Sequence, residues 1–511
     1  MNRRRLFVGA VLAAAAGTPS LSLGCGAPKA TPSKAASGSA SGSGSASAGT
    51  GSGAGSGNAS SGGVTAGSTG ATSGSKGPGG NGVFFAVTTG NDVYALDETD
   101  GHDVWGGPHN IGMPAAADGP PPYCGNIHPL GILSTPVIDA APGPDGFATI
   151  YVAGAVGEQY IERHEVHALS VKDGSERAGW PINVSAIQAS ASTAAGITNF
   201  HLTASDQRSA LSLVNGILYV AYGGHVGDCD TYHGWVIAID TSNPAKTGAW
   251  VTAGQGEAIW AAGGMASDGT GVIAVTSNRN GGGGPHQDSE EVVRITGLAT
   301  LARSNATIFY PSNWDYLDGN DLDFGSSSPV FVQVGAGSYV AALTKNGDFY
   351  LLDAANFGGT DPGNLVPPNG SHLTVAQSGM SIRTAPAFYT SAAGAHVAFN
   401  ANGAEGCPMG AGTSIMSVLL SPGAPPTPNV AWCASTSGQT SPIATTSDGT
   451  ADALVWFVNG TNLVALDGDT GAVVVTATGG CNNVRQWTSP IALKGRVVAG
   501  GDGNLCSWSV H

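Results

Sequence analysis

The chain has 511 residues, of which only 11% are charged, and it contains 80 glycines and 29 prolines. This composition is typical of many short strands joined by turns, and no long helical pattern of apolar residues is present. The formal net charge of −16 at pH 7 argues against nucleic acid as a partner.

Residues 1–25 form a predicted signal segment. Three arginines, Arg3 to Arg5, precede an apolar run from Leu6 to about Gly17. That run of roughly 12 residues is too short to span a bilayer, which needs about 20. The segment is therefore expected to direct export rather than to remain as a membrane span.

Cys25 closes this segment, with Leu21, Leu23 and Gly24 directly upstream. The pattern resembles a bacterial lipobox, in which the cysteine is acylated and becomes the new N-terminus. A plain secretory signal with cleavage elsewhere is the alternative, because Ser22 stands where the best lipoboxes carry leucine. We predict lipidation at Cys25 and a lipoprotein of the outer membrane or cell surface, with the periplasmic side also open.

Residues 26–82 form a predicted linker. From Thr31 to Gly80 the chain is nearly all Ser, Gly, Ala and Thr, a composition that has nothing to bury and favours a flexible tether. Fifty such residues reach about 40 Å by random-coil scaling. Without residues 1–24 the chain keeps 16 basic and 35 acidic residues, a charge of −19, and the lipid anchor is its only predicted contact with a membrane.

Residues 83–511 contain a repeat. The stretch Leu463–Asp467 is followed by Gly-Asp-Thr-Gly, and versions of it recur along the chain. The other copies are Val93–Asp97, Val166–Leu169, Val236–Asp240 and Phe349–Asp353. Alternating apolar residues that run into an Asp-containing turn, renewed every few tens of residues, predict small antiparallel sheets stacked around an axis. The fold class is an all-β propeller.

Proline-led segments mark the starts of the repeat units, because proline lacks a backbone donor and suits the edge strand at the centre of a blade. The predicted openings are Pro136, Ala210, Met265, Pro329, Pro386, Pro442 and Pro490. Irregular third strands are expected at Val292–Gly297, Ser414–Leu420 and Leu505–Val510. We predict eight four-stranded blades, with seven as the alternative. The first unit lacks an inner strand and the last lacks an outer one, so pairing of the two would close the ring.

Tryptophans and aspartates of the repeat have predicted structural roles. Packing between blades is expected for Trp105, Trp180 and Trp250, and hydrogen bonds to turn amides are expected for the aspartates that end the repeat strands.

Six cysteines follow Cys25, and an even number in an exported protein indicates disulfides. Six cysteines allow 15 connectivities. The predicted pairs are Cys481 with Cys506 and Cys407 with Cys433, which leaves Cys124 with Cys229.

The Val-Tyr-Ala-Leu-Asp-x-x-x-Gly-x-x-x-Trp units resemble the pyrroloquinoline-quinone-like repeats of quinoprotein β-propellers, over roughly residues 83 to 511. That superfamily includes calcium- and quinone-dependent alcohol dehydrogenases. It also includes non-catalytic propellers such as the lipoprotein of the outer-membrane barrel-assembly machinery. The resemblance implies the fold more directly than an activity.

The dehydrogenases of that superfamily imply candidate site residues. Asn278, at the end of a strand-like stretch, matches their metal-ligating asparagine, and Asp315 in a Trp-Asp-Tyr element matches their catalytic aspartate. The quinone would stack on a tryptophan such as Trp260.

Two further elements of the enzymes are missing. The ligating glutamate is replaced by His225 in a longer loop, where Asp228 or Asp230 would have to substitute, and no pair of adjacent cysteines occurs. Calcium wants six to eight oxygen ligands, including carboxylates.

Two other clusters suggest metals. His225, Asp228, Cys229, Asp230 and His233 could hold zinc or copper, although a loop pinned by a disulfide is the alternative. The acidic stretch 315–323 could wrap calcium, with a solvated loop as its alternative.

These patterns predict a tethered, monomeric propeller that acts as a non-catalytic binding module in the cell envelope, with a protein or a glycan as partner and no cofactor. The alternative is a periplasmic dehydrogenase of quinoprotein type. That enzyme would use pyrroloquinoline quinone and calcium, with Asp315 as the base.

Overall fold

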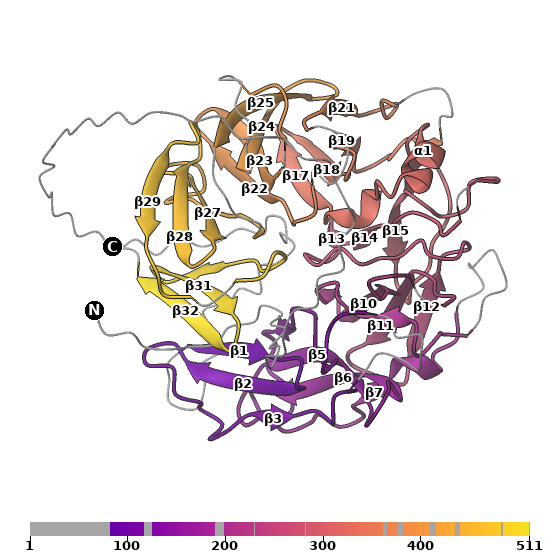
Figure 1. Cartoon of the computed structure of the whole chain (residues 1–511), viewed down its shortest axis with the longest axis vertical. Helices are drawn as coiled ribbons and strands as arrows, with labels where there is room; N and C mark the ends of the chain where they lie inside the picture. Colours follow the sequence, from indigo (N-terminus) through magenta and orange to yellow (C-terminus); the bar gives the residue numbers. More distant parts are fainter. Residues whose placement is uncertain are drawn as a thin grey trace, which may run out of the picture. The chain divides into compact units, whose positions relative to one another are not determined.

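A computed structural model describes residues 82–509, apart from 117–124, 190–198, 229, 282, 361–364, 377–381, 402, 408–414, 435–439 and 482–483. The described part consists of eight sheets arranged as a ring (Figure 1), in which the last sheet lies beside the first. The protein is an eight-bladed β-propeller, as predicted, and the seven-bladed alternative is wrong. The predicted signal segment 1–25 and nearly all of the linker 26–82 lie outside the described residues.

The first four blades follow the chain. Blade 1 contains β1 (Val83–Val87), β2 (Asp92–Asp97) and β3 (His109–Asn110). Blade 2 contains β4 (Val137–Asp139), β5 (Thr149–Val156), β6 (Arg163–Ser170) and β7 (Ile182–Asn183). Blade 3 contains β8 (Ser205–Asp206), β9 (Ser212–Val214), β10 (Ile217–Gly224), β11 (Trp235–Asp240) and β12 (Thr247–Val251). Blade 4 contains β13 (Ala266–Ser267), β14 (Gly271–Val275), β15 (Val292–Thr296) and β16 (Ile308–Tyr310), with β20 (Gly359–Thr360) added in parallel.

The last four blades keep the same plan. Blade 5 contains β17 (Val330–Val334), β18 (Gly337–Leu343), β19 (Asp348–Asp353) and β21 (Ser371–Thr374). Blade 6 contains β22 (Ala387–Ser391), β23 (Gly394–Asn400), β24 (Ile415–Ser421) and β25 (Thr427–Ala434). Blade 7 contains β26 (Ile443–Thr445), β27 (Leu454–Asn459), β28 (Asn462–Asp467) and β29 (Val473–Ala477). Blade 8 contains β30 (Ile491–Leu493), β31 (Arg496–Gly501) and β32 (Asn504–Ser509).

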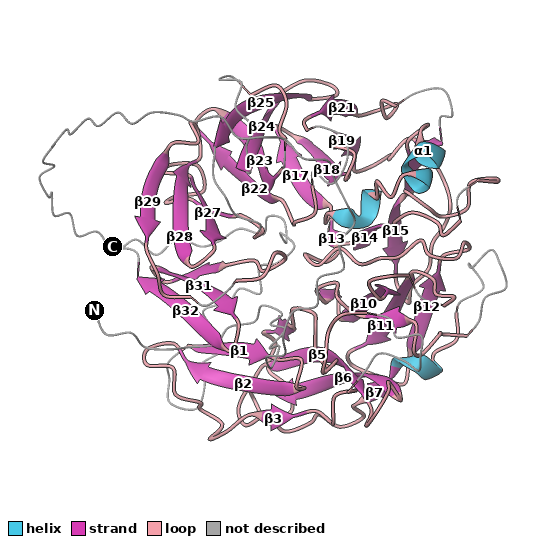
Figure 2. Ribbon diagram, viewed as in Figure 1, coloured by secondary structure: helices cyan, strands magenta, loops and turns pink. Residues whose placement is uncertain are grey.

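The helices are short and lie in the connections (Figure 2). They are α1 (Trp314–Gly319), η1 (Val184–Ala186) and η2 (Phe324–Ser326).

Every predicted unit opening lies at the start of an inner strand. For example, Pro136 directly precedes β4 and Pro442 directly precedes β26. The predicted third strands are β15, β24 and β32. Consecutive inner strands contact each other around the ring, as β22 does with β17 and β26.

The ring closes between blades 1 and 8 by packing of side chains. Phe84, Leu96 and Val498 share one apolar cluster, and Lys494 Nζ lies 2.9 Å from a carboxylate oxygen of Glu98. Within the described residues no strand of blade 1 is hydrogen-bonded to a strand of blade 8. The expected pairing of the terminal units is therefore replaced by face-to-face packing, because each unit already forms a three-stranded sheet of its own.

The repeat residues have the structural roles that were predicted. Asp467 accepts a hydrogen bond from the amide of Thr470 at 2.8 Å, and Asp97, Asp240 and Asp353 accept equivalent bonds. Trp105 of blade 1 donates its indole N–H to the carbonyl of Val171 in blade 2 at 3.1 Å.

The described residues contain the predicted disulfides Cys407–Cys433 and Cys481–Cys506. Cys124 and Cys229 lie outside the described residues. Their neighbours come close, because the amide of Gly125 donates to the carbonyl of Val226 at 3.0 Å.

Candidate ligand-binding rim

One rim of the ring carries all the candidate site residues. In an antiparallel blade, the connection after the second strand and the connection after the fourth strand emerge at the same end. The long connections 225–234, 252–265, 276–291 and 311–329 are all of these two kinds. They come from blades 3 and 4, so the topology gathers them on one face; we call this face the long-loop rim.

Trp260 is an aromatic side chain of this rim. It lies in the connection 252–265 and is half-buried. Two cations approach its ring, with Arg208 Cζ at 5.2 Å and Lys345 Nζ at 5.8 Å from the ring centre. Such distances are those of cation–π contacts.

Both cations are also paired with carboxylates. Arg208 Nε lies 3.2 Å from Asp206 Oδ2. Lys345 Nζ lies 2.5 Å from Asp323 Oδ2 and 2.8 Å from Asp321 Oδ1. Burial lowers the pKa of Lys345, but the attraction of Asp323 and Asp321 outweighs burial and holds the pKa above its ordinary value. Lys345 therefore remains a fixed positive charge beside Trp260.

Asn278 lies next to this ion pair. Its backbone N–H donates to Asp323 Oδ1 at 3.3 Å, while its own carbonyl accepts from the amide of Glu257. The carboxylate that meets Asn278 is thus Asp323. Asp315 is exposed on α1.

The three loop candidates of blade 3 lie in separate environments. His225 is buried, and its Nδ1 is 3.9 Å from Asp206 Oδ2. Asp228 accepts a hydrogen bond from the hydroxyl of Tyr232 at 2.5 Å. Asp230 is exposed and lies 3.5 Å from the exposed ring of His201.

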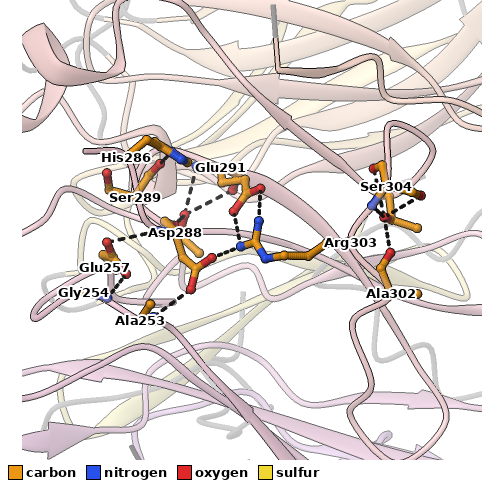
Figure 3. A network of polar contacts seen from close by, with 12 residues as sticks. Ala253, Gly254, Glu257, His286, Asp288, Ser289, Glu291, Ala302, Arg303 and Ser304 are labelled. Carbon is orange, nitrogen blue, oxygen red and sulfur yellow. Dashed lines mark hydrogen bonds and ion pairs between the residues drawn. The ribbon is translucent and has the colours of Figure 1, made fainter. Parts of the chain in front are cut away.

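A network of buried carboxylates, which sequence reasoning missed, supports this part of the rim (Figure 3). Arg303 lies between Asp288 and Glu291 and forms ion pairs with both. Glu257 accepts from the amide of Gly254 at 2.6 Å and from the amide of Asp288 at 3.2 Å. The sequence does contain a signal for this network, because the polar run from Asp288 to Glu291 directly precedes the apolar strand β15.

Acidic groups outnumber basic groups in the described part of this region. The buried carboxylates are Glu257, Asp288, Glu290, Glu291, Asp318 and Asp323. The basic side chains that neighbour them are Arg279, Arg303 and Lys345. Burying a carboxylate without a counter-charge favours its protonated form.

The pKa values follow from this excess of acid. Burial raises the pKa of Glu257 to about 7. Burial, and then the charge of Asp323, raise the pKa of Glu290 well above its ordinary value, although the amide of Phe324 donates to its carboxylate. Burial also raises the pKa of Glu291 and Asp318.

Calcium does not fit the residues that the sequence proposed for it. Asp228 accepts from Tyr232, His225 lies beside Asp206, and Asp323, the carboxylate at Asn278, is already paired with Lys345. Over the described ranges, the only His, Cys, Asp or Glu side chains whose ligand atoms lie within 4.8 Å of one another as a group of three or more are Asp97, Asp100 and His102. These three lie on the turn after β2, at the opposite rim.

No protein-family model matches the chain, and no curated protein matches it. Several solved structures are similar to it. Quinohemoprotein alcohol dehydrogenase ADHIIG from Pseudomonas putida HK5 is 15% identical, with a TM-score of 0.51 over 84% of this chain and 69% of that chain. The enzyme of the same name from Comamonas testosteroni is 14% identical, with a TM-score of 0.48 over 83% of this chain and 70% of that one.

A third similar structure is BamB from Moraxella catarrhalis, which is 13% identical with a TM-score of 0.46 over 84% of this chain and 93% of that chain. The likeness to the first enzyme shows that the two chains share the propeller fold. At these identities it shows the fold alone.

Within the described residues, no helix is both long and apolar enough to cross a membrane.

Proposed function

We propose that this protein is an envelope-tethered propeller that binds a ligand at the long-loop rim and does not catalyse a reaction. The observation that carries the proposal is the half-buried Trp260 with Arg208 and Lys345 at its ring. An aromatic face flanked by fixed donors, on loops held by a rigid ring, is suited to recognition.

The proposed partner is a glycan or a protein of the cell envelope, bound by a monomer. An aromatic ring stacks against the apolar face of a sugar or packs against a side chain. Arg208, with Asp206 beside it, supplies both donors and acceptors for the polar groups of either partner.

A binding assay tests this function with the full chain. Purified protein is titrated against envelope glycans, and cross-linked to envelope proteins with sites identified by mass spectrometry. Trp260→Ala is expected to weaken binding at least tenfold, because stacking area is lost. Lys246→Ala, exposed at the other end of blade 3, is expected to bind as the wild type does. Binding that survives Trp260→Ala would contradict the proposed site.

Anchoring is a separate part of the proposal, with Cys25 acylated and residues 26–82 as the tether. Cys25→Ser is expected to move the protein from the membrane fraction to the soluble fraction, as measured by fractionation and immunoblotting. Retention of the variant in membranes would show that the acyl anchor is wrong.

A quinoprotein-type dehydrogenase is the second candidate function. Trp260 favours it, because pyrroloquinoline quinone is planar and carries carboxylates that Arg208 and Lys345 could bind. When bound, this quinone accepts two electrons and two protons from an alcohol. Calcium has no free carboxylate beside Asn278, because Asp323 is already paired with Lys345.

The second candidate is tested by incubating the protein with quinone and calcium and following alcohol-dependent dye reduction. Turnover that is lost in Asp315→Asn or Asp323→Asn would support the enzyme and overturn the binding module. Absence of quinone binding and of turnover would remove the enzyme and leave the glycan and protein titrations to decide.

A further inference from the structure

Two buried histidines, one on blade 2 and one on blade 3, lie within electrostatic reach of each other. His164 is the second residue of β6, and His225 follows β10 directly. Their exposed fractions are 2% and 3%. The segment from Leu202 to Ser205 links the two side chains, because it makes hydrogen bonds to both rings.

Hydrogen bonds to backbone carbonyls fix the proton on each ring. His164 Nε2 lies 3.1 Å from the carbonyl oxygen of Leu202, and the backbone of Thr203 accepts a hydrogen bond from His225. A carbonyl only accepts, so the nitrogen that faces it carries the hydrogen. The other nitrogen of each ring, Nδ1 of His164 and Nε2 of His225, therefore presents a lone pair.

Neither lone pair has a partner within the part of the chain that the structure describes, and both atoms are buried. The hydroxyl of Ser205, which β8 places opposite Gly224 and so next to His225, is a third buried polar atom without a partner there. Ser205 thus neighbours His225, and the charge of His225 reaches His164. Buried polar groups are normally bonded, so these unpartnered atoms indicate a missing ligand.

The surroundings keep both imidazoles neutral. Burial lowers the pKa of His164 to about 4, and burial also lowers the pKa of His225. The ring of His164 is packed edge-on against Phe200 and Tyr222, at 5.4 and 5.3 Å between centres. A neutral imidazole held rigidly, with its second nitrogen donating to a carbonyl, is the arrangement in which histidine binds metals.

We propose that His164 Nδ1 and His225 Nε2 bind one divalent transition-metal ion, Cu²⁺ or Zn²⁺, between blades 2 and 3. Imidazole is a preferred ligand of both ions. The Ser205 hydroxyl or solvent takes the remaining positions. This site shares Asp206 with the Trp260 group, because Asp206 lies beside both His225 and Arg208. It does not depend on the proposed function of the rim.

The test uses the full chain without an affinity tag. One equivalent of Cu²⁺ is expected to bind per chain, and its electron paramagnetic resonance spectrum is expected to show at least two imidazole nitrogens. His164→Gln and His225→Gln are each expected to weaken binding more than about tenfold, since loss of even an outer partner of a ligand costs ten- to a hundredfold.

Two results would overturn the proposal. One is a wild-type protein that binds no Cu²⁺ or Zn²⁺, which would leave water as the partner of the lone pairs. The other is binding that is lost in His102→Ala and kept in His164→Gln and His225→Gln, which would place the ion at the turn of Asp97, Asp100 and His102. The spectrum of the wild type decides the ligand type even if a variant fails to fold.

Discussion

Glu257 illustrates how the long-loop rim depends on single residues. Its carboxylate holds the amides of Gly254 and Asp288, and its backbone is in the left-handed region, with φ 47°. A non-glycine residue there is unfavourable unless its surroundings hold it. At this position the contacts of the Glu257 side chain therefore outweigh the unfavourable backbone conformation of the residue.

Folding stability is expected to fall as pH rises from about 4.5 to about 7. Burial raises the pKa of Glu257 from 4.5 to about 7, so the folded state binds more protons than the unfolded state in this window. Below pH 4.5 the carboxyl is protonated in both states. Above pH 7 the group has lost its stabilising contribution, which amounts to at most about 3 kcal/mol. Chemical denaturation at several pH values measures the slope.

Glu257→Gln is expected to flatten that slope, because an amide does not titrate. Glu158→Gln, at an exposed carboxyl, is the control and should leave the slope unchanged. Stability that rises with pH between 5 and 7 would contradict the expectation.

Gly263 marks a close approach between blades. A Cβ there would lie 2.4 Å from Cβ of Ala385 and 2.5 Å from Oγ of Ser328. Gly263→Ala is expected to lower the free energy of unfolding by about 1–3 kcal/mol through overpacking. Gly319→Ala in α1, where a Cβ meets nothing within 4 Å, should not destabilise. Equal stability of the two variants would show that the blades can shift apart.

At the scale of elements, strand positions were predictable and side-chain networks were not. Strands could be located because the blades repeat an alternating apolar pattern and five of them open on a proline. The network of Glu257, Asp288 and Arg303 joins residues up to 46 positions apart, and no local pattern encodes that contact. The Trp-Asp-Tyr element predicts Asp315 as the candidate base, whereas the approach of Asp323 to Asn278 is set by the fold.

Strand β29 is an exposed outer edge. Val473, Val474 and Val475 are 57%, 53% and 38% exposed, and in the described part β29 pairs only with β28. Apolar edges of this kind template aggregation. Val474→Lys is expected to reduce light scattering on heating with little change in Tm, whereas Leu365→Lys, at an exposed leucine outside the strands, should not. Unchanged light scattering in Val474→Lys would show that this edge does not drive aggregation.

At the scale of the whole molecule, the disulfides of the described residues and the seam between blades 1 and 8 hold the ring. Cys481–Cys506 ties blade 8 to its preceding connection and closes a separation of 25 residues, while Cys407–Cys433 closes 26. The seam between blades 1 and 8 has an exposed ion pair between Glu98 and Lys494, which contributes about 0–1 kcal/mol. Most of its strength comes from the apolar cluster.

Cys481→Ser with Cys506→Ser is expected to lower stability by about 3.5 kcal/mol, the chain-entropy value for a loop of this length. Lys494→Gln is expected to cost less than about 1 kcal/mol. Denaturant unfolding of both variants measures the difference. A larger loss from Lys494→Gln than from the double serine variant would mean that the ion pair, rather than the disulfide, governs closure.

The alternation of strand direction has an evolutionary consequence. Substitutions or insertions in the loops of blades 3 and 4 change one face of the wheel, while the Asp-held turns keep the other face constant. Proteins that share this wheel can therefore diverge in what they recognise without any cost to how they fold, and similarity of the ring alone is a poor guide to a common ligand.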